Sequence, residues 1–175
     1  MNKLERISNI AVILTCLIVV GSVGRSWYQG YAARRSNIHK GQLVSLPGQA
    51  LAGKSTLVMA LSVGCHFCQD SVPFYQKLSA FKNSSPGLRM VAVFPQPTAE
   101  AIAYLKKQGI AVDAVASLPL GQVGVRGTPT LLLLDEQSKV HEVWEGKLND
   151  KQETEVISSL KKVCPGCALA AAVVP

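Results

Sequence analysis

The feature that most constrains this chain is a pair of cysteines, Cys65 and Cys68, between an apolar run of strand length and a segment with helical periodicity. The run over 56–62 has the length and composition of a buried strand. Apolar residues recur at helical spacing over 65–82, and Pro73 predicts a kink in that helix. The pattern therefore predicts a strand, a tight turn and a helix that begins at the first cysteine.

The rest of the chain predicts further elements of both kinds. They are a short hairpin over 42–45 and 49–51, a strand over 88–94, a helix over 98–108, a short strand over 111–116, an irregular stretch or short helix over 118–126, two strands over 130–135 and 140–145 that form a hairpin, and an amphipathic helix over 151–163. The order is βαβα followed by ββα, which is typical of an α/β fold.

The N-terminus predicts a membrane anchor. Residues 7–24 carry no ionisable side chain except the Cys16 thiol, and as a helix they would span about 27 Å, close to the thickness of a bilayer core. Aromatic residues follow at once, as in an interfacial belt. We interpret residues 1–26 as an uncleaved anchor. The alternative is a secretory signal cleaved after the small residues Ser22 and Gly24.

Four regions follow from this interpretation: the anchor, a tether over 27–41, a domain over 42–163 and a tail over 164–175.

The orientation of the domain depends on two arguments that disagree. Basic residues are more numerous after the apolar run than before it, which would place the domain in the cytoplasm. A single anchor ahead of a small thiol domain, and its need for disulfide-bearing clients, favour the extracytoplasmic, periplasmic side, and we expect the latter.

The position of Cys65 at the start of a helix predicts its chemistry. Unpaired N–H groups and the positive end of the helix dipole favour thiolate over thiol, and the thiolate is the nucleophile in disulfide exchange. Cys68, one turn later, can attack the resulting mixed disulfide and release the partner. The imidazole of His66 would stabilise the thiolate further if it lies near the sulfur, or it faces solvent with no role. Both interpretations of His66 stay open.

Several motifs resemble the thioredoxin superfamily: the strand over 57–61, Cys65-His-Phe-Cys68, the following proline, and Gly127-Thr-Pro-Thr130 before a strand. The anchor and tether are most similar to its membrane-anchored branch, which includes TlpA- and ResA-like proteins and those serving cytochrome c maturation. The resemblance covers about residues 40–163. It implies a thioredoxin fold, with a central mixed β-sheet flanked by helices.

The resemblance also implies roles for particular residues. Pro129 would be a cis-proline packed against the cysteine pair, which would leave the backbone of Thr128 to bind an extended client chain. One departure is Met59, which occupies the position where thioredoxins proper hold a buried acid that takes the proton of the second cysteine. The direction of electron flow is therefore open from the residues alone.

The leading prediction is a protein thiol–disulfide oxidoreductase that acts on disulfides of exported proteins, reductively as in cytochrome c maturation. It needs no cofactor and no metal. Its partners would be a disulfide-containing client, a membrane-bound upstream redox protein and the membrane through residues 7–24. Nucleic acid is not an expected partner, because the 18 Lys and Arg residues are scattered rather than clustered on one face.

The role of a second cysteine pair is open, and two alternative functions remain. A second pair, Cys164 and Cys167, could relay electrons to the first, form an inert local disulfide, or join the first pair in a four-thiolate zinc site. The chain could instead be a module that binds zinc or copper through its thiols. A thiol peroxidase is the other alternative: Ser62 fits the peroxiredoxin pattern before the cysteine, but Val58 replaces its proline.

Overall fold

The computed structural model describes residue 13, residues 15–21 and residues 38–164. The chain divides into two compact units, residues 1–35 and 36–175. In the first unit residues 15–21 are helical, with large apolar side chains exposed. Among the described residues, no helix is both long and apolar enough to cross a bilayer. Most of the predicted anchor and tether lies outside the described residues.

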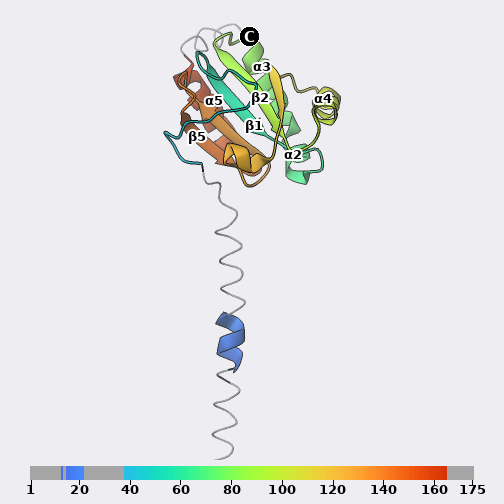
Figure 1. Ribbon diagram of the computed structural model, residues 1–175, viewed down its shortest axis with the longest axis vertical. Coiled ribbons are helices and arrows are strands. Elements are labelled where there is room, and N and C mark those ends of the chain that lie inside the picture. The colour runs from blue at the N-terminus through green and yellow to red at the C-terminus, as the bar shows by residue number, and fades with distance from the viewer. Residues whose placement is uncertain (1–12, 14, 22–37, 165–175) are drawn as a thin grey trace, which may run out of the picture. The chain divides into compact units, whose positions relative to one another are not determined.

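The second unit is built on one mixed sheet (Figure 1). Its elements are β1 (Ser55–Ala60), α2 (His66–Asp70), α3 (Val72–Asn83), β2 (Leu88–Phe94), α4 (Thr98–Lys107), β3 (Ala114–Ser117), the 3₁₀ helix η1 (Leu120–Val123), β4 (Thr130–Leu134), β5 (Val140–Glu145) and α5 (Asp150–Val163). The strand order is β3-β2-β1-β4-β5. β1 pairs in parallel with β2 and antiparallel with β4, so the predicted α/β fold with a mixed sheet is confirmed.

The central strand β1 is buried on both faces, which explains why it reads as a continuous apolar run. Leu57 and Met59 point to one side and pack in a core with buried residues of α3, α4 and α5. Val58 and Ala60 point to the other side, where residues of η1 and of the segment 38–51 cover the sheet. Helices therefore cover one face, and the N-terminal segment of the domain covers much of the other.

The segment 42–51 is not the predicted hairpin of two strands. It makes only isolated bridges, between Leu46 and Gln49 and between Leu43 and Lys139. The side chains of Val44, Leu46 and Leu51 are buried against the sheet, while that of Leu43 is exposed. Packing onto the sheet, rather than pairing within the segment, determines its path.

The predicted kinked helix over 65–82 is two helices. α2 ends at Ser71, which is also the residue before the first turn of α3. Pro73 lies in that first turn, where its missing N–H has no intrahelical partner to lose. The proline therefore begins a second helix instead of bending one. Because of this break, α2 is a short helix, with Cys65 as its N-cap and Cys68 within it.

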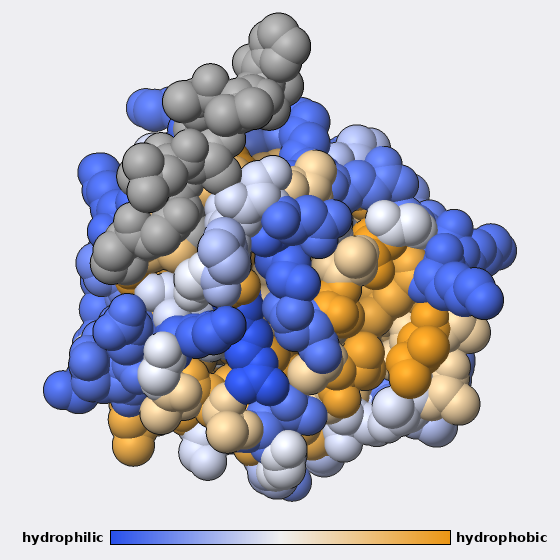
Figure 2. Space-filling view, turned by 90° about the horizontal axis from the view of Figure 1, so that it is seen from above, coloured by the Kyte–Doolittle hydropathy of each residue, from blue (hydrophilic) through white to orange (hydrophobic). Residues whose placement is uncertain are grey.

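The two ends of the sheet hold different parts of the chain. α2 follows the carboxyl end of β1, whereas the end of α5 meets its amino end, because Ser55 Oγ donates a hydrogen bond of 2.9 Å to the Val163 carbonyl. Figure 1 shows α2 and the end of α5 at opposite ends of the domain. Figure 2 looks at the end opposite α2, and hydrophilic side chains cover much of it.

Candidate active site at the carboxyl end of the sheet

Cys65 is the N-cap of α2, and its sulfur accepts a hydrogen bond from a backbone N–H of the first turn, as a Ser or Asp oxygen does at other helix starts. The Cys68 backbone N–H donates to Cys65 Sγ over 3.2 Å. Cys65 has extended backbone angles and follows the loop after β1, so the strand positions it at the open end of the helix. The unpaired N–H groups and the positive end of the dipole of this short helix therefore face the Cys65 sulfur.

A second loop approaches the same sulfur from far along the chain. Cys65 Sγ lies 3.3 Å from the Thr128 carbonyl oxygen and donates to it as a thiol. The Thr128–Pro129 peptide bond is cis, as the resemblance to the thioredoxin superfamily implies. Pro129 immediately precedes β4, which pairs with β1, so the central sheet brings the two loops together.

The two thiols have opposite electrostatic environments. Partial burial would raise the pKa of Cys65, but hydrogen bonds with the side chains of Cys68 and Thr128 and with backbone N–H groups outweigh it, so that pKa lies below its ordinary value. Cys68 is fully buried, and this burial, together with its contact with Cys65, raises its pKa to about 12. At neutral pH the pair therefore holds one accessible sulfur inclined to ionise and one shielded thiol.

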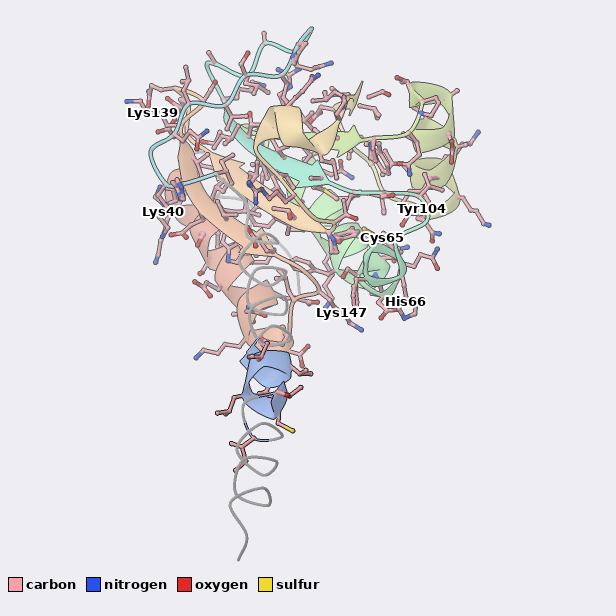
Figure 3. All side chains as sticks on the ribbon, turned by 60° about the horizontal axis from the view of Figure 1, so that its bottom comes forward. Lys40, Cys65, His66, Tyr104, Lys139 and Lys147 are labelled. Carbon is pink, nitrogen blue, oxygen red and sulfur yellow. The ribbon has the colours of Figure 1, made fainter. Side chains whose placement is uncertain are left out.

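His66 does not approach the Cys65 sulfur. Its side chain is 80% exposed, and its Nε2 lies 3.7 Å from Asp70 Oδ2, one turn along α2. The same Asp70 oxygen accepts a hydrogen bond of 3.0 Å from Lys147. The side-chain groups that lower the pKa of Cys65 are Cys68 and Thr128, not His66. Figure 3 shows Cys65, His66 and Lys147 at the same end of the domain, away from Lys40 and Lys139.

Sequence reasoning missed two tyrosines behind the cysteine pair. Tyr75 of α3 and Tyr104 of α4 belong to the same core cluster as Cys68. Burial raises the pKa of both phenols, and charge on Cys68 raises it further. The spacing of Ala101, Tyr104 and Leu105 marks the buried face of α4. Only the crossover of α4 back to the sheet brings that face into the same core as Cys68, so no local signal could have found Tyr104.

Cys164, the first cysteine of the second pair, lies far from this site. Cys164 is fully buried and disulfide-bonded, and it directly follows Val163 at the amino end of β1. The six residues of β1 alone separate that end from the loop of Cys65 by about 20 Å. Cys167 lies outside the described residues. A zinc site shared by both pairs does not fit this separation, and the described residues contain no cluster of three or more His, Cys, Asp or Glu that could hold a metal.

Comparisons with known proteins agree with this geometry. No family model matches the chain. Thiol-disulfide oxidoreductase ResA of Bacillus thuringiensis (strain Al Hakam) is 27% identical over 169 residues, which cover 87% of this chain and 95% of the relative. The Bacillus anthracis ResA has the same identity and coverage.

Solved structures show the same fold. The putative thiol:disulfide interchange protein DsbE of Chlorobium tepidum has a TM-score of 0.56 at 24% identity and covers 73% of this chain and 99% of its own. A putative protein disulfide isomerase of Bacteroides thetaiotaomicron has a TM-score of 0.60 at 14% identity, over 74% of this chain and 92% of its own.

Fold, site and relatives together define a thiol–disulfide oxidoreductase with the thioredoxin fold. The chain has the fold of the thioredoxin superfamily, and among named proteins it is similar to ResA.

Proposed function

We propose that this protein reduces disulfides of exported client proteins through Cys65 and Cys68. The observation that carries the proposal is the contrast between the two sulfurs. Cys65 is partly exposed at a helix N-terminus with a lowered pKa, whereas Cys68 is buried with a raised one. An accessible thiolate beside a shielded thiol is the arrangement that two-step disulfide exchange requires.

The reaction runs through a mixed disulfide. The Cys65 thiolate attacks one sulfur of the client disulfide, and the other client sulfur leaves with the electron pair of the broken bond. Cys68 then attacks the Cys65 sulfur, so that the second client sulfur leaves and Cys65 and Cys68 are oxidised to a disulfide. Burial keeps Cys68 from reacting with outside disulfides, and its place one turn from Cys65 makes the second attack intramolecular.

Client binding is assigned to the loop of Thr128 and Pro129, through the backbone of Thr128; the Pro129 carbonyl already accepts a hydrogen bond from the Gly146 N–H. The Thr128 carbonyl lies beside Cys65 Sγ, so an extended client chain that pairs with this loop would bring its own cysteine to the attacking sulfur. The Phe67 ring, between the two cysteines in sequence, is 55% exposed and offers an apolar contact at the same place. Pairing through the client backbone allows many client sequences, whereas the single contact with Phe67 adds a modest preference for apolar client residues.

We place the domain outside the cytoplasm on a single N-terminal anchor over residues 7–24, with a membrane-bound protein that returns Cys65 and Cys68 to the thiol state. The apolar run supports the anchor, and the exposed apolar side chains of residues 17–20 are suited to lipid. The reductive direction follows the branch of the superfamily that this chain resembles. A membrane-impermeant maleimide added to intact cells tests the location, because it labels Cys65 only if the domain faces outward.

Trapping of clients tests the function. In a Cys68→Ala variant the mixed disulfide at Cys65 cannot be resolved, so clients should remain bound and be released by dithiothreitol. The matched control carries Cys65→Ala as well and should trap nothing. A wild-type protein with no measurable two-electron midpoint potential would contradict the proposal. Stoichiometric zinc or copper after reducing purification would favour the metal-binding alternative, and rapid consumption of hydrogen peroxide would favour a peroxidase.

A further inference from the structure

The release step leaves a problem that the two cysteines do not solve alone. This inference rests on the proposed function, in which Cys68 must become a thiolate to attack the mixed disulfide. Its pKa of about 12 makes that form rare at neutral pH. After burial, the residues that affect the pKa of Cys68 are Cys65, Ser62 and Thr128, and none of them is a carboxylate. Met59 of β1 belongs to the same core cluster as Cys68, but its side chain cannot donate a hydrogen bond to the sulfur.

Tyr104 has a hydroxyl that the resting structure does not use. The residue is only 7% exposed, and its hydroxyl oxygen is buried with no hydrogen-bond partner. Such a group is destabilising in a folded protein and calls for an explanation. Tyr104 and Cys68 belong to one core cluster, and charge on either active-site sulfur raises the pKa of the Tyr104 phenol. The hydroxyl is therefore within electrostatic range of the reacting atoms.

The Tyr104 ring is fixed by packing in the core cluster that also contains Cys68. Its edge packs on the Phe94 ring at the carboxyl end of β2, with the centroids 5.8 Å apart. Tyr104 also lines a hollow of about 300 Å³ together with Val63 and Gln69, which flank the cysteine pair in sequence. Figure 3 shows Tyr104 at the same end of the domain as Cys65.

Tyr75 provides a comparison within the same core. It is also buried, and charge on Cys68 raises its pKa as well. Ser71, however, lowers the pKa of the Tyr75 phenol, whereas the buried Tyr104 hydroxyl has no hydrogen-bond partner. Of the two phenols, Tyr104 is the one with a donor left over for a new acceptor.

We propose that the Tyr104 hydroxyl donates a hydrogen bond to the Cys68 sulfur as negative charge develops on it, and so accelerates resolution of the mixed disulfide. Tyr104 keeps its own proton throughout. A bond forms between the Cys68 and Cys65 sulfurs while the bond from Cys65 to the client sulfur breaks. The client sulfur leaves with that electron pair and ends as a thiol with the proton that Cys68 gave up. Because the hydrogen bond is absent in the resting state, it contributes selectively to the transition state.

The Tyr104→Phe variant tests the proposal, because it removes only the hydroxyl and retains the ring. The reduced protein is mixed with 5,5′-dithiobis(2-nitrobenzoate). Attack by Cys65 releases one coloured thiolate, and attack by Cys68 releases a second, so each molecule reports both steps. The first phase should be unchanged. The second should slow by about 10- to 100-fold at pH 7, the effect of one hydrogen bond to a charged group. Its apparent pKa should also move upward, and the difference from wild type should shrink at high pH.

The Tyr75→Phe variant is the matched control, and its second phase should stay close to that of wild type. A second phase of Tyr104→Phe within about twofold of wild type at every pH would overturn the inference and leave the proposed function standing. Equal slowing in both variants, or loss of both phases in Tyr104→Phe, would assign the phenols a structural role and also overturn it. A wild-type protein without a second phase would refute the proposed function itself.

Discussion

Cys65 and Cys68 should differ by more than a thousandfold in their reactivity toward an alkylating agent. A pKa of about 12 leaves about one Cys68 thiol in 10⁵ ionised at pH 7. The pKa of Cys65 lies below its ordinary value of 9.0, so more than about 1% of Cys65 is thiolate at that pH. Only the thiolate reacts, and Cys68 is also fully buried, so the ratio from ionisation alone is a lower limit.

The assay uses Cys68→Ser and Cys65→Ser variants treated with iodoacetamide from pH 5 to 11, with each cysteine followed by peptide mass spectrometry. Removal of Cys65 also removes part of what raises the pKa of Cys68, but burial, the largest cause, remains. Cys68 should therefore still ionise above the ordinary thiol range. Comparable rates for the two cysteines at pH 7, or a Cys65 inflection at or above the ordinary value, would refute the assignment of attacking and resolving thiols.

Three further results are expected. Cys68→Ser should accumulate mixed disulfides on non-reducing gels, while Cys65→Ser should form none; equal trapping by both variants would reverse or remove the assigned roles. Asp113→Asn should lower stability to urea by about 1 kcal/mol near pH 7, because the carboxylate pairs with Lys82 and holds a lowered pKa. That loss should vanish as the pH falls through this pKa, since the wild-type carboxyl is then protonated too. Cys167→Ser should leave the midpoint potential of Cys65 and Cys68 unchanged, since Cys164 lies at the other end of β1; a shift of about 30 mV or more in protein film voltammetry would show that the tail contacts the site.

The local part of the site was predictable because it depends on residues close in sequence. The apolar run before Cys65 and the helical periodicity after it predict a thiol at a helix start, and the structure has Cys65 as the N-cap of α2. Pro73 predicted a disturbance of the following helix in the right place. Its form, two helices separated at Ser71, was not predicted, because proline at a first turn begins a helix as readily as it bends one.

Other features required the three-dimensional arrangement. The sequence predicted a hairpin over 42–51, but Val44, Leu46 and Leu51 are buried against a sheet that includes β4 and β5, which come much later in the chain. His66 could have faced either the sulfur or solvent, and only the position of Asp70 one turn away shows which partner it takes. Tyr104 gave no signal at all, since its hydroxyl matters only through its nearness to Cys68.

The sequence by itself determined the order of elements, the buried central strand and the pair of thiols at a helix start, because these depend on periodicity and on neighbours within a turn or two. The tertiary structure decided which distant groups lie near those thiols, with Thr128 beside Cys65 and Tyr104 in the same core cluster as Cys68. It also decided that Cys164 lies at the far end of the sheet. The physical reason is that strand pairing and helix crossover join residues separated by tens of positions, and burial then determines which of them share a low-dielectric environment.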